Sequence, residues 1–190
     1  MNAGIIAEDD SDVAVVSAIT LKLLRPHDIG FKKFVSGGCG KLRRKCAAWA
    51  RNLVERGCLW IIVVHDLDEN DEQQLREELT ACVVPSGAEA TVVLIPRREI
   101  EAWLLYDARA IATAFRQRPH LPLPGNPEIL LDPKKHLSEL VWRRYRKVYL
   151  NTLHNGLIAQ HINVALLRRS ASFAPHFLFA RQVTARIRRG

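Results

Sequence analysis

The sequence predicts an α/β fold in which a mostly parallel, four-stranded sheet is flanked by helices and followed by a C-terminal helical extension. Two observations support this expectation. Up to about residue 99, short apolar segments alternate with amphipathic helical segments, as in right-handed βαβ units. Beyond that point the strand-like segments stop and the pattern is helical.

Four segments have the apolar composition of buried strands. The clearest, Leu59–Val64, is continuously apolar and rich in β-branched residues, as expected for a central parallel strand that is covered on both faces. The other three are Gly4–Ala7, Phe31–Ser36 and Ala90–Ile95, and each is bounded by charged, glycine or proline residues. These four segments define the predicted sheet.

Helices with one apolar face are expected between these strands. Ser11 or Asp12 can cap the first helix, which ends before Pro26. The next two helices are expected over Lys41–Gly57 and Glu72–Cys82.

The second half of the chain is expected to be helical apart from one loop. We expect an α/β core over residues 1–117, a proline-rich connecting loop over residues 118–133, and a helical extension over residues 134–190 that packs on the core. The predicted helices are Ile100–Phe115, Lys134–Leu150, Asn155–Arg168 and Ser172–Arg188.

The composition is that of a globular protein with a basic surplus. Hydrophobic residues make up 48% and charged residues 25% of the 190 residues, and the formal net charge is +8. The acidic N-terminus does not resemble a signal peptide, and no apolar run reaches the roughly 20 residues that span a bilayer. The four cysteines, Cys39, Cys46, Cys58 and Cys82, form no Cys-x-x-Cys pair and are interpreted as free thiols, which favours the cytoplasm.

Acidic residues follow two of the predicted strands. Glu8 comes directly after the first strand, and Asp66 and Asp68 come after Leu59–Val64. Because ligands of an open parallel sheet bind beyond the carboxyl ends of its strands, these carboxylates can share one edge. If residues 66–68 are extended, alternation points Asp66 and Asp68 the same way. Hard oxygen ligands of this kind suit Mg²⁺ or Mn²⁺, and Asp12 is either a fourth ligand or only a helix cap.

The residues Glu8-Asp9-Asp10-Ser11-Asp12 and Val64-His65-Asp66-Leu67-Asp68 resemble the toprim domain of topoisomerases, primases and overcoming-lysogenisation-defect (OLD) nucleases. Toprim domains carry a Glu after the first strand and Asp-x-Asp after a later one. The Glu8 and Asp12 spacing is closer to the OLD-like nucleases. One departure is Asp9, which stands where toprim sequences commonly have a glycine.

A nearer resemblance is to a small stand-alone toprim-like group with a Glu-x-Glu-Ala-Trp segment after the fourth strand. Here that segment lies within Ile95–Leu105, and the later Asp132-Pro133-Lys134 and Ser172-Phe173 are also similar. The resemblance covers nearly the whole chain. It implies a toprim-like, Rossmann-like fold with a magnesium site.

Three further residues could take part in such a site. Glu99 and Glu101 follow the fourth strand, and one of them could complete a second metal site; the alternative is that they favour a helix N-terminus through the helix dipole. Lys134 could stabilise charge on a phosphate in the transition state, or it could be a solvated residue of a first helical turn. His65 is expected to pack or to support the ligands from outside.

Two basic clusters could bind nucleic acid, or they could simply be solvated helix faces. The candidate residues are Arg43, Arg44, Lys45, Arg143, Arg144 and Lys147. The four tryptophans are expected to lie in the core rather than to stack on bases.

These patterns predict a metal-dependent nuclease that hydrolyses phosphodiester bonds of DNA or RNA, in which Glu8, Asp66, Asp68 and Lys134 carry the chemistry. The resemblance to OLD-like nucleases implies a role in defence against phage or other foreign elements. The alternative is a metal-binding regulatory module that acts only with a companion protein such as an ATPase, since the chain has no phosphate-binding Gly-x-x-x-x-Gly-Lys loop. Topoisomerase activity is disfavoured because Tyr106, Tyr145 and Tyr149 lack a supporting sequence context.

Overall fold

The structure, a computed structural model, describes residues 1–118 and 121–189, and Cys39 by its backbone alone. Within these residues the centre of the fold is a four-stranded sheet of order β2-β1-β3-β4 in which every pairing is parallel. The predicted α/β class with a parallel sheet is therefore confirmed. The strands are β1 (Asn2–Ala7), β2 (Gly30–Val35), β3 (Trp60–Val64) and β4 (Ala90–Leu94).

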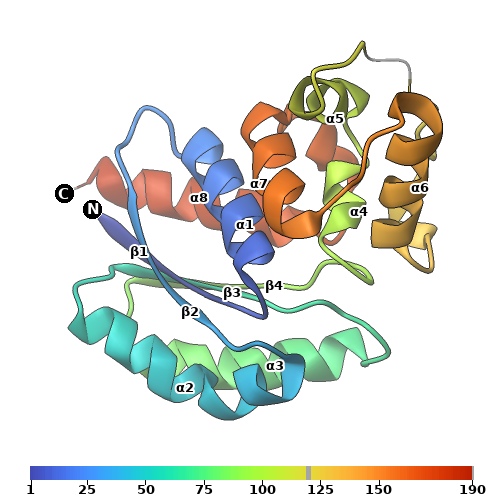
Figure 1. Ribbon diagram of the computed structural model, residues 1–190. Coiled ribbons are helices and arrows are strands. Elements are labelled where there is room, and N and C mark those ends of the chain that lie inside the picture. Colours follow the sequence, from blue (N-terminus) through green and yellow to red (C-terminus); the bar gives the residue numbers. More distant parts are fainter. Residues whose placement is uncertain (119–120, 190) are drawn as a thin grey trace.

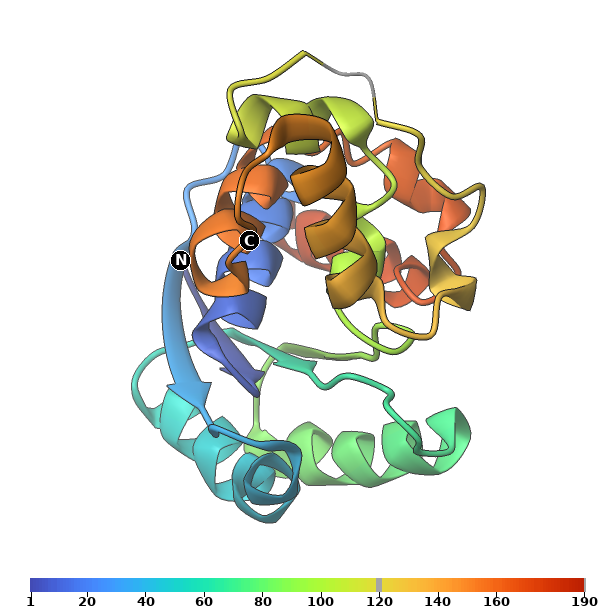
Figure 2. The ribbon, with the colours of Figure 1, turned by 45° about the vertical axis from the view of Figure 1, so that its right-hand side comes forward.

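Helices cover both faces of the sheet. Figure 1 shows α2 (Cys39–Glu55) and α3 (Glu72–Val83) beneath the sheet, with α1 (Asp10–Leu23) and α8 (Ala174–Ile187) above it. The turned view in Figure 2 shows the same two layers. The remaining helices extend the upper layer: α4 (Glu101–Leu104), α5 (Ala108–Ala114), α6 (Pro133–Tyr145) and α7 (Asn151–His161), with short 3₁₀ turns at η1 (Val84–Ser86), η2 (Pro127–Ile129) and η3 (Leu166–Arg169).

Successive side chains of β3 point alternately into two separate hydrophobic cores. Trp60, Ile62 and Val64 belong to the larger core between the sheet and α1, whereas Ile61 and Val63 belong to the core between the sheet and the pair α2 and α3. All five are buried, which explains why this strand is continuously apolar. On β1, Gly4 lets α2 approach closely, because a Cβ atom there would lie 2.8 Å from side-chain atoms of Ile61 and of a leucine of α2.

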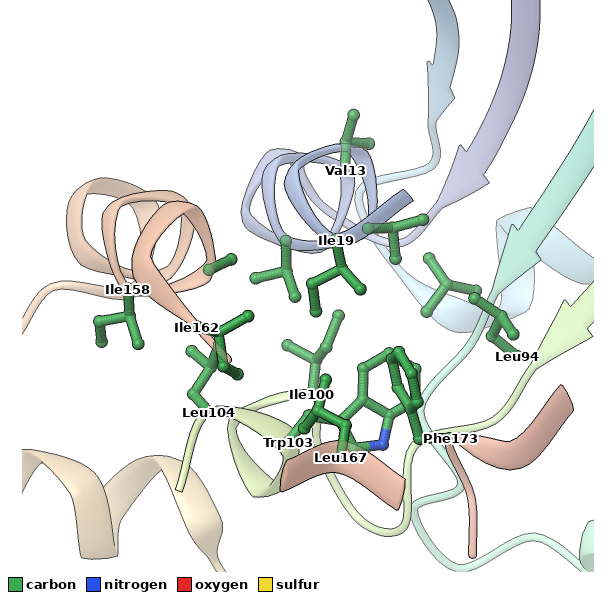
Figure 3. Packing of buried hydrophobic residues seen from close by; sticks show 14 of the residues in the cluster. Val13, Ile19, Leu94, Ile100, Trp103, Leu104, Ile158, Ile162, Leu167 and Phe173 are labelled. Carbon is green, nitrogen blue, oxygen red and sulfur yellow. The ribbon is translucent and has the colours of Figure 1, made fainter. Parts of the chain in front are cut away.

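The upper core joins the helical extension to the sheet. Figure 3 shows Ile19 of α1 facing Ile100 and Trp103. Trp103 donates a hydrogen bond from Nε1 to Ser172 Oγ at 2.8 Å and packs edge-on against Phe173, with ring centroids 5.0 Å apart. The Glu-x-Glu-Ala-Trp segment and Ser172-Phe173, far apart in sequence, are therefore in contact.

Three predicted helices have different bounds in the structure. The single helix expected over Ile100–Phe115 is wrong: the chain breaks after α4, and Asp107 caps α5 by accepting from two backbone N–H groups. The helix expected over Lys134–Leu150 ends at Tyr145, because Arg146 adopts a left-handed conformation with φ 54°. The helix expected over Asn155–Arg168 is instead α7, and the last part of that range is the turn η3.

Other sequence expectations concern the loop and the cysteines. The loop expected over residues 118–133 contains η2, and positions 119 and 120 lie outside the described residues. Cys46, Cys58 and Cys82 are free thiols, as expected, while the side chain of Cys39 lies outside what the structure describes. Burial raises the pKa of Cys46 to about 12. None of the described helices has the length and apolar character needed to cross a bilayer.

Candidate metal centre

Two neighbouring strands deliver the first carboxylates of the candidate site. Glu8 follows β1 directly, and Asp66 follows β3 after His65. Because β1 and β3 run parallel and pair with each other, with Ile6 opposite Val63, their carboxyl ends meet at the same edge. The sequence-based expectation that Glu8 and Asp66 share one edge is consistent with this topology.

The start of α1 adds Asp12 to this edge. The expected caps, Ser11 or Asp12, are wrong: the N-cap is Asp9, whose Oδ1 accepts from Ser11 N at 2.7 Å and from Asp12 N at 3.1 Å. Asp12 completes a capping box, since its Oδ2 accepts from Asp9 N at 3.2 Å. Asp9, where toprim sequences commonly have glycine, therefore has a structural role. Asp12 shares in the cap through Oδ2, and its carboxylate also lies within electrostatic range of Glu8, Glu101 and Asp66.

Asp12 and Asp66 are held in surroundings that disfavour their charged forms. Burial raises the pKa of Asp12 to about 7, and repulsion from Asp9, Glu101 and Glu8 adds to the effect. Burial also raises the pKa of Asp66 well above its ordinary value, and the charges that reinforce this effect are those of Asp12, Glu101, Glu8 and Asp68. Four carboxylates contributed by different loops and helices thus lie within electrostatic range of Asp66.

Two carboxylate oxygens at the centre of this cluster are buried without a hydrogen-bond partner among the described residues: Asp66 Oδ1 and Glu8 Oε1. The pKa of Glu8 is raised by burial, an effect that the nearby His65 opposes and the charge of Asp68 reinforces. His65 Nδ1 lies 3.1 Å from Glu8 Oε1, but it makes its hydrogen bond with the backbone oxygen of Asp66 at 2.6 Å. A buried, unpaired carboxylate oxygen is costly unless a cation or a proton compensates it.

Glu101 is held by the helical extension. It is 1% exposed, and its Oε1 accepts from Tyr149 Oη at 2.9 Å and from Asn155 Nδ2 at 3.1 Å. Asn155 also donates to Ser11 Oγ at 3.4 Å, which links α7 to the start of α1. Burial raises the pKa of Glu101 although the Lys134 charge and these hydrogen bonds act against the shift.

Lys134 and Glu99 form the outer wall of the cluster. Glu99 Oε2 accepts from Lys134 N at 2.9 Å, and its Oε1 lies 3.5 Å from Lys134 Nζ. Burial opposes the charge of Lys134, but attraction to Glu101, Glu99 and Asp66 outweighs it and raises the pKa. Lys134 is therefore a cation that faces the carboxylates. Figure 2 shows α6, which carries Lys134 in its first turn, beside α4, which begins at Glu101.

Asp68 does not have the expected conformation. The extended backbone expected over residues 66–68 is wrong at Asp68, which adopts a left-handed conformation with φ 46° and is exposed to solvent. Aspartate tolerates this region better than most residues do. Asp68 remains close enough to raise the pKa of both Asp66 and Glu8.

The carboxylate oxygens are donors of the kind that a hard divalent cation prefers, but the side chains are too far apart to hold one as they stand. Within residues 1–118 and 121–189, no three Asp, Glu, His or Cys side chains are close enough together to hold a metal ion as they stand. The oxygen-only chemistry and the two unpartnered carboxylate oxygens nevertheless suit Mg²⁺ or Mn²⁺. Binding of such an ion would have to draw the carboxylates closer together.

The chain matches, over residues 8–178, the family model described as Domain of unknown function (DUF4276). The chain belongs to the DUF4276 family. The matched range starts at Glu8 and contains every residue of the carboxylate cluster, together with Lys134 and the two side chains that hold Glu101. Comparison with curated proteins and with solved structures gives no significant match. The description of DUF4276 states no activity, so the toprim resemblance stays a prediction.

The basic candidates of this DUF4276 protein lie in two groups, one on α2 and one at the end of α6 and just after it. Arg43 forms an ion pair with Glu78 and lies 3.5 Å from Asn70 Oδ1, next to the loop that follows β3. Arg143 pairs with Glu139 within α6 at 2.9 Å. It lies roughly 14 Å along the helix from Lys134, at a rise of about 1.5 Å per residue. The other four candidates are exposed: Arg44, Lys45, Arg144 and Lys147.

The sequence interpretation missed the residues that hold Glu101 in this DUF4276 protein. The sequence gives no context that marks Tyr149 or Asn155 as a partner of Glu101. Their role depends on the packing of α7 against α1, where a Cβ atom on Gly156 would lie 3.0 Å from the Cβ of Ala14. Asn155 stands among other polar residues of α7, such as Asn151 and His154, so the sequence carried no signal for its role.

Proposed function

We propose that the protein is a Mg²⁺- or Mn²⁺-dependent nuclease that hydrolyses phosphodiester bonds of DNA or RNA. The observation that carries this proposal is the gathering of carboxylates around Asp66 at one edge of the sheet, with Lys134 facing them. This combination of several acidic groups and one cation suits a reaction in which metal ions and a lysine meet a phosphate.

Glu8, Asp12, Asp66 and Asp68 would hold the metal, and Glu99 or Glu101 would complete a second site. When bound, Mg²⁺ or Mn²⁺ lowers the pKa of a water molecule and neutralises charge on the phosphate. Residues of the chain would orient a metal ligand and place a positive charge beside the phosphate. Tyr149 and Asn155 fix the orientation of Glu101, and Lys134 offers positive charge where a phosphate oxygen becomes more negative.

The charge of the chain supports a polyanionic substrate. The formal net charge is +8 although the site itself is acidic. The exposed residues Arg44, Lys45, Arg144 and Lys147 are available to phosphates, whereas Arg43 and Arg143 already pair with glutamates. Free thiols at Cys46, Cys58 and Cys82 support a cytoplasmic location. We include a role in defence against phage or other foreign elements, and this part of the proposal rests only on the resemblance to OLD-like nucleases.

One observation favours a second candidate function. Because no three potential ligands among the described residues are close enough to hold a metal as they stand, a partner could be needed to close the site. The chain would then be a metal-binding regulatory module that acts with a companion protein such as an ATPase.

The test compares the wild-type protein with Asp66→Asn and with Asp10→Asn on plasmid, single-stranded DNA and tRNA, each with Mg²⁺ or Mn²⁺. Asp10 is a matched control because it is an exposed carboxylate of the same helix start, paired with Lys33. We expect cleavage by the wild type and Asp10→Asn and none by Asp66→Asn. Cleavage that persists in Asp66→Asn refutes the proposal that the carboxylates around Asp66 form the metal site. Metal binding by calorimetry without cleavage by any of the three proteins favours the partner-dependent module.

A further inference from the structure

A second pocket lies at the other end of α1, away from the carboxylates. Asp12 is in the first turn of α1 and Lys22 in the last, which separates them by roughly 15 Å at about 1.5 Å of rise per residue. The pocket has a volume of about 580 Å³ and is formed by the end of α1, the turn η3 and one side of α8. Figure 1 shows α1 and α8 close together above the sheet.

Four cations line this pocket and no acidic residue does: Lys22, Arg168, Arg181 and Arg188. In the part of the chain that the structure describes, none of the four forms an ion pair with a carboxylate. The acidic residue that acts on Lys22 electrostatically is Asp107, and its carboxylate already accepts from the backbone N–H groups of residues 109, 110 and 163. Among the described residues, the four cations of the pocket are therefore not paired with a carboxylate.

Lys22 is fixed at the edge of this pocket. Its Nζ donates to the backbone oxygen of Ile162 at 2.7 Å, which leaves two of the three ammonium protons for other acceptors. Burial and repulsion from Arg25 lower its pKa, so that an anion beside it would be favourable.

The remaining wall of the pocket is apolar. Leu23, Val164, Phe177 and Ala180 contribute to it. The guanidinium carbon of Arg168 lies 5.2 Å from the centre of the Phe177 ring, so Arg168 stacks on an aromatic face. A planar guanidinium stacked in this way offers a further flat surface to an aromatic ring.

We infer that this pocket binds a nucleotide, with its phosphates against the cations and its base against the apolar wall and the Arg168 plane. The volume lies in the range of small-molecule sites, about 300–1,000 Å³. Arginine suits phosphate because its planar fork can donate two parallel hydrogen bonds. An acidic peptide would satisfy the charges but not the flat apolar wall. The inference does not depend on the carboxylate cluster, and a free nucleotide and the end of a nucleic acid strand share the required chemistry.

The test measures binding by calorimetry in EDTA, so that the carboxylate site does not contribute. The ligands are AMP, ATP, a 5′-phosphorylated oligonucleotide, pyrophosphate and polyglutamate. The proteins are the wild type, Arg181→Glu and Arg186→Glu. Arg186 is the matched control because it is an exposed arginine of the same helix that does not line this pocket.

We expect AMP or ATP to bind the wild type and Arg186→Glu, and Arg181→Glu to weaken that binding by about tenfold or more, as expected for a lost charged hydrogen bond. Tighter binding of the oligonucleotide with the same dependence on Arg181 also supports the inference and identifies a strand end as the source. The inference is overturned if no nucleotide binds, if pyrophosphate or polyglutamate binds as tightly as AMP, or if Arg186→Glu weakens binding equally.

Discussion

The substitution Asp12→Asn tests whether negative charge in the buried carboxylate cluster lowers the stability of the fold. Asp12 is 6% exposed, and its pKa in the folded chain is about 7 against an ordinary value of 3.8. Between these two values the folded chain binds a proton that the unfolded chain does not. Stability therefore falls as the pH rises through this window, and the loss is complete above about pH 7.

The size of the effect follows from the same two values. The difference between 7 and 3.8, at about 1.4 kcal/mol for each pH unit, gives roughly 4 kcal/mol at pH 8. An asparagine at this position carries no charge, and its carbonyl oxygen can still accept from Asp9 N. For a chain of this length, about 2–4 °C per kcal/mol predicts that the variant melts roughly 8–16 °C higher at pH 8. At pH 5, about 1.2 pH units above the ordinary value, the same reasoning gives a loss of only roughly 1.6 kcal/mol, so the variant should melt about 3–6 °C higher.

The assay is thermal unfolding in EDTA at pH 5 and pH 8, followed by circular dichroism. Asp10→Asn is the control, because it removes an exposed carboxylate from the same helix. Added Mg²⁺ should stabilise the wild type at pH 8 more than it stabilises Asp12→Asn, since a cation relieves the same repulsion. If Asp12→Asn melts at or below the wild type at pH 8, the argument that buried charge destabilises this edge is refuted.

Three other predictions concern the residues around the site and the core. Tyr149→Phe removes the hydroxyl donor to Glu101 and should weaken Mg²⁺ binding about tenfold by calorimetry; unchanged affinity would contradict the role of Tyr149. Glu128→Gln should cost about 2–3 kcal/mol at pH 7 in urea unfolding, because the Glu128 carboxylate accepts several hydrogen bonds from residues 170–172. These bonds overcome burial and lower the pKa of Glu128, so the advantage of the wild type should shrink as the pH falls below about 4.5, and a constant difference would count against it. Burial lowers the pKa of His176 to about 3, so the neutral ring is favoured in the fold, and wild-type stability should fall between pH 6.5 and 3. At pH 5 the loss from His176 is about 2 kcal/mol, which His176→Gln should remove; equal pH dependence of the two proteins would exclude this explanation.

The strands could be predicted from the sequence because their pattern has a local cause. Leu59–Val64 is apolar throughout since both faces of β3 are covered, and the observed strand differs by one residue. The helices of the second half were harder to predict. A helix is interrupted at Asp107 because this side chain caps α5, and another ends at Arg146 because this residue is left-handed. The hydrophobic pattern predicts neither feature.

The candidate site could be predicted where it depends on the strands, but not where it depends on a loop or on the packing of helices. Glu8 and Asp66 follow strands whose carboxyl ends must meet, so topology alone places them together. The conformation of Asp68 and the support from Tyr149 and Asn155 could not be predicted, because they depend on a loop turn and on the packing of α7 against α1.

The position of α8 has a consequence for synthesis on the ribosome. This helix packs on β4, and Phe173, which precedes it, packs on Trp103. Until residues 173–187 have left the exit tunnel, the upper face of β4 and the Trp103 ring lack their cover, although all four strands have already been made. The nascent chain therefore carries an exposed apolar face through the synthesis of about half its length, a stage at which such a face favours aggregation.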